Sequence, residues 1–126
     1  MTSRDQQQWN ITYAPEFEEW IKAQDLPILE EFRVKVLILK EYGPRLGRPH
    51  VDTLNDSKYP NMKELRFSVD NHVVRITFVF DPKRKAVFLT GGEKQGVSQK
   101  QFYKDLIKAS DKIYKRYLEE NYGKEK

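Results

Sequence analysis

Two short runs of alternating apolar and polar residues, 62–69 and 72–80, constrain the fold of this chain more than any other feature of its sequence. Such alternation is typical of β-strands that bury one face. The residues between the runs are Asp70 and Asn71, which tolerate the positive φ angles that a two-residue hairpin turn requires. The sequence therefore predicts a β-hairpin that closes on Asp70 and Asn71.

The position of the turn fixes the register of this hairpin, because each residue before the turn then has one partner after it. Val69 faces His72, Phe67 faces Val74 and Leu65 faces Ile76, which builds one apolar face. On the opposite face Arg66 lies beside Arg75. Two like charges directly opposite each other destabilise a sheet, so we expect this pair to hold an anion. The alternative is that each arginine pairs with a carboxylate of the protein, for which Glu64 is nearby.

Length and composition suit one compact domain. The 126 residues, 38% of them hydrophobic, are enough for a single core, so we expect one domain over 1–126 with flexible ends at 1–8 and 121–126. With no cysteines and two histidines, neither a disulfide nor a metal site built from these residues is expected, and no cofactor is predicted. The absence of a leading apolar segment and of any membrane-spanning window favours a cytoplasmic protein.

Charge is distributed unevenly along the chain. Residues 1–31 carry two basic and seven acidic side chains, whereas residues 32–93 carry twelve basic and seven acidic ones. Residues 94–126 add nine basic and five acidic side chains, within an overall net charge of +4. This asymmetry favours a polyanionic partner for one surface.

The residues before the hairpin predict one strand and two helices. Alternation over 9–13 indicates the strand, and Pro15 suits the first turn of a helix. A second helix should run from Leu26 or Pro27 to Tyr42, where Gly43-Pro44 ends it, although the run 36–39 alone could form a strand. Residues 43–61 follow as a connector without periodicity, and loops of this length are often functional. The expected buried residues are Phe17, Trp20 and Ile21 on the first helix and Leu29, Phe32, Val36 and Leu39 on the second.

The residues after the hairpin predict one more strand and a long helix. A turn over 81–85 leads into a strand over 86–90 that Gly91-Gly92 ends, and the last helix covers about 98–120. Its expected buried face is Phe102, Leu106, Ala109, Ile113 and Tyr117. An N-terminal strand and two helices, an antiparallel meander and a C-terminal helix define an α+β fold.

The glycine-rich run 91–96 does not predict a nucleotide site. It contains Lys94 but lacks the Gly-Lys-Ser/Thr ending that holds phosphate and magnesium in a P-loop. The serine, histidine and aspartate residues form no recognisable nucleophile elbow, so a catalytic triad is not expected either.

Basic and hydroxyl side chains remain as candidates for chemistry. They are Arg66, Arg75, Lys94 and Tyr103, with His50, Lys63 and Glu64 as sequence neighbours. Such a set suits metal-free RNA cleavage, in which the 2′-OH of the substrate attacks the adjacent phosphate. Arginine stabilises the developing charge without titrating, and a lysine, glutamate, tyrosine or histidine can transfer the protons. Three of these residues also have a simpler interpretation. Tyr103 could be a packing residue, Lys94 a solvated loop residue, and His50 a residue that fixes the connector.

Several stretches of the chain form a specific pattern when they are taken together. They are 43–54, 61–66, 80–86 and 89–94, with Arg75 in its strand and with Phe102-Tyr103, 109–111 and Tyr114 in the last helix. Together they resemble the RelE/HigB-type toxins of bacterial toxin–antitoxin modules, and in particular the phage-derived HigB-like branch. The resemblance covers residues 9–120.

This resemblance implies a RelE-like fold and an endoribonuclease that cleaves mRNA, commonly at the ribosome, and so inhibits translation. It also implies a cognate antitoxin, often of the helix-turn-helix type. By position, Arg66 and Arg75 match the strand arginines of the family, Lys94 its basic residue after the last strand and Tyr103 its helix tyrosine. We add Glu64 as a catalytic candidate and assign Arg48, His50 and Lys63 to substrate binding.

The chain departs from the family pattern at one place. Typical RelE members carry a Lys-x-Lys pair before the arginines, where this chain has Met62 and Glu64. Glu64 or His50 could replace a lysine as the base, whereas alternation puts Lys63 on the apolar face with Leu65.

Two other functions stay open: a ParE-like toxin that binds DNA gyrase without cutting RNA, and a non-toxic phage-derived binding protein.

Overall fold

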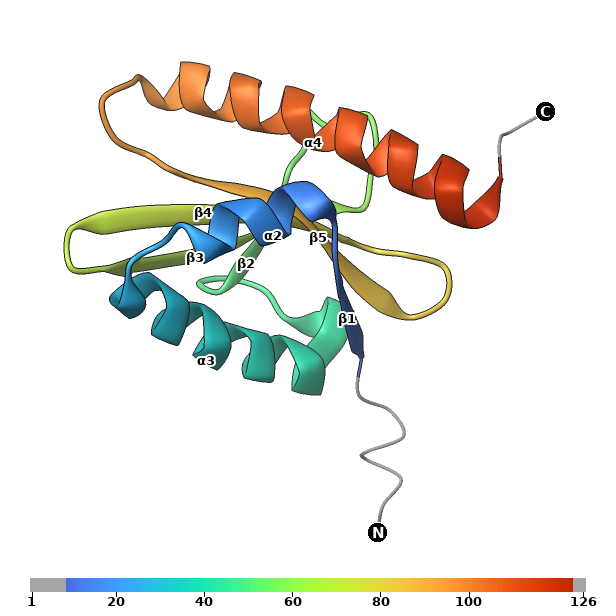
Figure 1. Ribbon diagram of the computed structural model, residues 1–126, viewed down its shortest axis with the longest axis horizontal. Coiled ribbons are helices and arrows are strands. Elements are labelled where there is room, and N and C mark those ends of the chain that lie inside the picture. The colour runs from blue at the N-terminus through green and yellow to red at the C-terminus, as the bar shows by residue number, and fades with distance from the viewer. Residues whose placement is uncertain (1–8, 124–126) are drawn as a thin grey trace, which may run out of the picture.

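The computed structural model describes residues 9–123 and has the α+β architecture that the sequence predicts (Figure 1). Its elements in chain order are β1 (Asn10–Tyr13), α2 (Pro15–Lys22), α3 (Leu26–Tyr42), the 3-10 helix η1 (Gly43–Arg45), β2 (Val51–Thr53), β3 (Met62–Val69), β4 (His72–Phe80), β5 (Lys85–Glu93) and α4 (Gln99–Tyr122). Within the described residues, no helix combines the length and apolar character that a membrane crossing requires.

The five strands form one sheet in the order β1-β5-β4-β3-β2, in which β1 runs parallel to β5 and the other neighbours are antiparallel. The predicted hairpin is confirmed in both turn and register. Asp70 and Asn71 have φ angles of 46° and 70°, and Arg66 pairs directly with Arg75. The hairpin therefore sets the two arginines side by side on one face of the sheet.

Helices cover both faces of the sheet, with α4 on one side and α3 on the other (Figure 1). The α2/α3 side holds an aromatic cluster in which the Phe17 ring lies 5.3 Å from that of Phe32 and 5.4 Å from that of Phe88. The α4 side packs Ile107, Ile113, Tyr114 and Tyr117 on the sheet. Most of the polar residues that the sequence predicts as candidates for chemistry lie on this second face, which α4 covers only in part.

All three of the expected buried stripes need correction. On α2, Phe17 is buried whereas Trp20 and Ile21 are half-buried against the core. On α3, Ile28, Phe32 and Leu39 are buried whereas Leu29 and Val36 are only half-buried. On α4, Ala109 is exposed and Ser110 is buried in its place. The Ser110 hydroxyl lies 2.7 Å from that of Thr77 and also donates to the Leu106 carbonyl, so a polar pair sits where periodicity predicts an apolar residue.

The connector is more regular than the sequence predicts. Residues 43–61 contain both η1 and β2, and β2 adds to the edge of the sheet by pairing with β3. Val51 is buried opposite Leu65, but a strand of three residues is too short to show alternation. The loop after β2 is tied to α4, because Asp111 accepts hydrogen bonds from the Ser57 hydroxyl (2.6 Å) and the Lys58 amide (3.1 Å).

Strand β5 continues through the two glycines that were expected to end it. It reaches Glu93 because Gly91, Gly92 and Glu93 pair with Ile76, Arg75 and Val74 of β4, and the rings of Trp20 and Phe102 lie over the two glycines. A Cβ atom on Gly91 would come within 2.7 Å of the Trp20 ring, so only glycine lets α2 approach this closely.

The last helix ends at Tyr122, two residues beyond the predicted end. The hydroxyls of Tyr117 and Tyr122 donate to the buried carboxylate of Asp81 at 2.9 and 2.7 Å. Burial alone would raise the pKa of Asp81, but these bonds and two from backbone amides hold that pKa below its usual value. Asn121 and Tyr122 thus belong to the helix, whereas 1–8 and 124–126 lie outside the described residues.

The start of α4 depends on one cap. The Ser98 hydroxyl accepts a hydrogen bond from the Gln101 amide at 3.1 Å, which satisfies an amide that the helix itself leaves unpaired. We expect Ser98→Ala to lower the free energy of unfolding by about 1 kcal/mol, measured by urea denaturation. Ser98→Asp, which can still cap, should stay close to wild type, and equal stability of the alanine variant would show that the cap contributes nothing.

Candidate functional site

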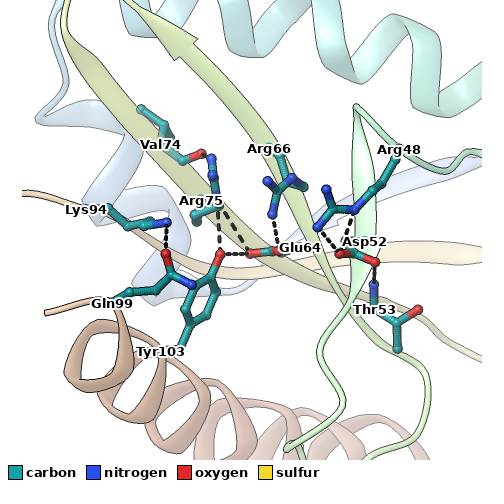
Figure 2. Close-up of polar contacts among 10 residues, drawn as sticks. All are labelled: Arg48, Asp52, Thr53, Glu64, Arg66, Val74, Arg75, Lys94, Gln99 and Tyr103. Atoms are coloured by element: carbon teal, nitrogen blue, oxygen red, sulfur yellow. Dashed lines mark hydrogen bonds and ion pairs between the residues drawn. The ribbon is translucent and has the colours of Figure 1, made fainter.

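Four polar side chains meet on the α4 face of the sheet (Figure 2). Glu64 and Arg66 lie two residues apart on β3, so strand alternation points both to the same face, and Arg75 lies beside them on β4. Tyr103 reaches the same point from the first turns of α4. Glu64 is 3% exposed and Arg75 7%, so the cluster is largely out of solvent, with Arg66 at its open side.

One carboxylate lies between the two guanidinium groups. Arg66 donates to Glu64 Oε2 at 2.7 Å, and the Arg75 Nε atom lies 3.7 Å from Glu64 Oε1. The Tyr103 hydroxyl donates to Glu64 Oε1 at 2.8 Å and accepts from Arg75 Nε at 3.1 Å. The alternative prediction is that each arginine pairs with a carboxylate of its own. Glu64 does supply a carboxylate, but both arginines share it.

The two arginines differ in how firmly they are held. Besides its contacts with Tyr103 and Glu64, Arg75 donates to the Val74 carbonyl at 2.9 Å, which fixes its guanidinium. Arg66 donates to Glu64 through a single nitrogen, and its side chain is partly exposed. Arg66 is therefore the more accessible of the two arginines to an incoming phosphate.

Lys94 completes the basic group just after β5. Its ammonium donates to the Gln99 side chain at 3.0 Å and lies 5.5 Å from the centre of the Tyr103 ring (Figure 2). Burial, and then the positive charges of Arg75 and Arg66, lower the pKa of Lys94. A lowered pKa makes the Lys94 ammonium a stronger proton donor.

The pKa of Tyr103 moves in the opposite direction. Burial raises it first, and the hydrogen bond to Glu64 raises it further. The side chain therefore stays a protonated phenol at neutral pH and acts as a hydrogen-bond donor. Tyr103 also packs against its neighbour, because the Phe102 and Tyr103 rings meet edge to face with their centres 5.3 Å apart.

Arg48 lies at the rim of the same face, as Figure 2 shows. It donates to Asp52 through two nitrogens at 3.0 and 2.9 Å, and Asp52 pairs with Glu64 in the β2–β3 register. The Arg48 side chain is exposed, so its position suits contact with a bound ligand.

His50 and Lys63 do not join this cluster. Lys63 follows Met62 on β3 and, as alternation predicts, points to the other face, where its ammonium donates to the Thr53 hydroxyl at 3.0 Å. The His50 ring contacts the ammonium of Lys35 on α3 at 3.0 Å. The structure thus separates these two candidates for substrate binding from the arginines.

Gln99 and Asp52 are the site residues that sequence reasoning missed. Gln99 comes four residues before Tyr103 on α4, a spacing that puts both on one helical face and could have indicated it. Asp52 lies in the short strand that periodicity does not reveal. Among the described residues, no group of three histidine or acidic side chains is placed to hold a metal ion.

The site offers positive charge next to proton-transfer groups. Two guanidiniums and one ammonium face a single carboxylate, so an anion entering the cluster is attracted. The planar guanidinium groups of arginine match the geometry of phosphate oxygens. A phenol, a carboxylate and a lysine of lowered pKa lie beside the two guanidinium groups. Such an arrangement can bind a phosphodiester and move protons next to it.

Comparison with solved structures identifies the class of fold. The chain is similar to a variant of the E. coli toxin RelE in its free state, with a TM-score of 0.61. The match covers 88% of this chain and 99% of that one, at 11% sequence identity. The fold is therefore RelE-like.

Sequence comparison then identifies the family. Residues 19–115 match the family described as "Phage derived protein Gp49-like". The chain is 38% identical to "Putative toxin HigB3" of Mycobacterium tuberculosis, covering 90% of this chain and 96% of the relative. It is 41% identical to "Putative toxin HigB2" of the same organism over 79% of this chain, which spans about half (49%) of that relative.

The chain belongs to the Gp49-like family and, with these relatives, to the RelE/HigB type of toxins in toxin–antitoxin systems. The predicted resemblance is thereby confirmed. This membership implies an antitoxin as its partner.

Proposed function

We propose that this toxin is an endoribonuclease that cleaves mRNA in the cytoplasm, at the ribosome, and so inhibits translation. The observation that supports this most is the pair Arg66 and Arg75 set around one carboxylate, with the phenol of Tyr103 bonded to both Arg75 and that carboxylate. The pair supplies charge for a phosphate, and its neighbours supply proton transfer. The cognate antitoxin, of the helix-turn-helix type, restrains the activity.

The scissile phosphate binds to Arg66 and Arg75 in this mechanism. Arg66 is the more accessible of the two, and Arg75, held by Val74 and Tyr103, gives the site its fixed geometry. As the 2′-oxygen bonds to phosphorus, negative charge grows on the phosphorane oxygens. The guanidiniums stabilise that charge without changing protonation state, which is the main source of rate enhancement.

The protons move through the neighbouring groups. Glu64 accepts the proton of the attacking 2′-OH, and the P–O5′ bond breaks as the 5′-oxygen receives a proton from Lys94. The lowered pKa of Lys94 suits it to give up this proton, whereas Tyr103 keeps its own and holds Glu64 by a hydrogen bond. The products are a 2′,3′-cyclic phosphate and a 5′-hydroxyl end, and the charge stabilisation comes from side chains of this chain.

A test in cells separates this function from the gyrase-binding alternative. After induced expression in bacteria, we expect protein synthesis, measured by pulse labelling, to fall before plasmid supercoiling or DNA replication changes. The reason is that cutting mRNA stops translation directly, whereas gyrase poisoning acts on DNA first. Relaxed plasmid with intact mRNA would contradict the proposal and support a ParE-like function, and normal growth would support a non-toxic binding protein.

A further inference from the structure

A groove of about 1130 Å³ runs between α4 and the loop that follows β2. Tyr103 and Gln99 line it on the α4 side, and these residues contact Glu64 and Lys94 of the site. The groove therefore shares two of its lining residues, Tyr103 and Gln99, with the arginine cluster. The loop side is held in place, because Asp111 of α4 binds Ser57 and the Lys58 amide.

A row of lysines follows this groove along α4. The row consists of Lys100, Lys104, Lys108, Lys112 and Lys115. The first four are spaced by four residues, so they lie on one helical face with a rise of about 6 Å between neighbours. Over residues 9–123, none of the five ammonium groups forms an ion pair with a carboxylate. The row is thus an extended stripe of available positive charge.

The remaining lining includes groups for uncharged contacts. Tyr59 on the loop and Tyr103 on α4 provide aromatic rings, and Ile107 is apolar. Lys58 adds a further positive charge, whereas Asp56 and Asp111 are the carboxylates, of which Asp111 is already bound by the loop. Positive charge along a groove with aromatic rings is the combination that binds single-stranded nucleic acid without strict sequence preference.

We propose that this lysine groove holds the single-stranded RNA that flanks the scissile phosphate. The inference rests on the proposed function, because the strand in the groove is the one whose phosphate enters the arginine cluster. Successive phosphates contact the lysine row, and a base can stack on Tyr59. The groove then positions the substrate, while the chemistry stays with the arginine cluster.

Charge and position favour RNA over an acidic protein segment. A nucleic-acid strand carries one charge at every nucleotide and so matches a row of regularly spaced ammoniums. Tyr103 and Gln99, which line the groove, also contact Glu64 and Lys94 of the proposed phosphate site. An acidic segment of the antitoxin is the competing occupant, and the test below includes it as an outcome.

The test measures binding without cleavage. The probe is a fluorescein-labelled 2′-O-methyl RNA of about 12 nucleotides, which lacks the attacking hydroxyl, and its affinity for the purified protein is measured against salt concentration. For Lys104→Ala/Lys108→Ala/Lys112→Ala we expect the salt slope to fall by about 2, since each phosphate contact on a single strand contributes about 0.7. The control is Lys22→Ala/Arg33→Ala/Arg45→Ala, which removes three exposed charges elsewhere and should leave the slope close to wild type.

Each possible outcome decides the proposal. Equal slopes for wild type and the lysine variant, or no RNA binding by wild type, would overturn it. Loss of antitoxin binding with unchanged RNA binding would assign the groove to the antitoxin. If probe binding depends on the lysines but the wild type does not cleave unmodified RNA, the proposed nuclease is refuted and the RNA-binding groove is retained. If the wild type cleaves RNA but the lysine variant binds the probe as well as the wild type does, the nuclease is retained and the RNA-binding groove is refuted.

Discussion

Replacing both Arg66 and Arg75 by alanine is expected to lower the rate of mRNA cleavage by at least about 1,000-fold. Loss of one well-placed charge-stabilising donor costs about 100- to 1,000-fold, and here both groups that face the phosphorane are removed. The rate would be measured with purified protein and ribosome-bound message under single-turnover conditions, so that it reports cleavage and not product release.

Folding must be checked in the same variants, because the double change leaves the carboxylate of Glu64 buried without its partners. Thermal unfolding of each protein serves this purpose, and the partly exposed Arg66→Ala alone gives a variant in which Arg75 still faces Glu64. Arg33→Ala/Arg45→Ala removes two exposed positive charges away from the cluster and should keep full activity. Cleavage at the wild-type rate by a folded double variant would show that the phosphate binds elsewhere.

Changing Glu64 to glutamine is expected to lower the cleavage rate by about 100-fold or more while RNA binding is retained. The glutamine side chain has nearly the same shape, and its one oxygen can still accept from Arg66 while its NH2 group donates to the Tyr103 hydroxyl, but it cannot take the proton of the 2′-OH. Single-turnover cleavage and the salt-dependent binding of an uncleavable RNA would be measured on the same protein.

The matched control for this change is Glu30→Gln. Glu30 is exposed on α3, which covers the other face of the sheet, so the same carboxylate-to-amide change is made away from the proposed chemistry. We expect this variant to cleave within a few-fold of wild type. If Glu64→Gln cleaved as fast as the control, Glu64 would be only the counter-ion of the two arginines.

The part of the site that is local in sequence was predictable. A two-residue turn between alternating runs fixes the hairpin register, and the register alone puts Arg66 beside Arg75 and leaves Lys63 on the other face. Alternation needs no knowledge of the rest of the fold, which is why this prediction held residue by residue.

The part that depends on packing between distant segments was not predictable in the same way. Strand β2 has three residues, and its pairing with β3 is decided by the burial of Val51 against Leu65. The rotation of α4 about its axis buries Ser110 against Thr77 where Ala109 was expected. The same docking brings Tyr103 to Glu64 across 39 positions of sequence, a contact that no local pattern encodes.

The central claim is that the arginine cluster is the phosphate site of a ribonuclease, and mapping mRNA 5′ ends in cells tests it most directly. Primer extension would compare bacteria that express wild type, Arg66→Ala/Arg75→Ala and the control Arg33→Ala/Arg45→Ala at equal levels. We predict new ends carrying 5′-hydroxyl groups with the wild type and the control, and none with the arginine-cluster variant. Cuts from all three proteins would contradict the assignment of the site, and growth arrest without cuts would contradict the ribonuclease itself.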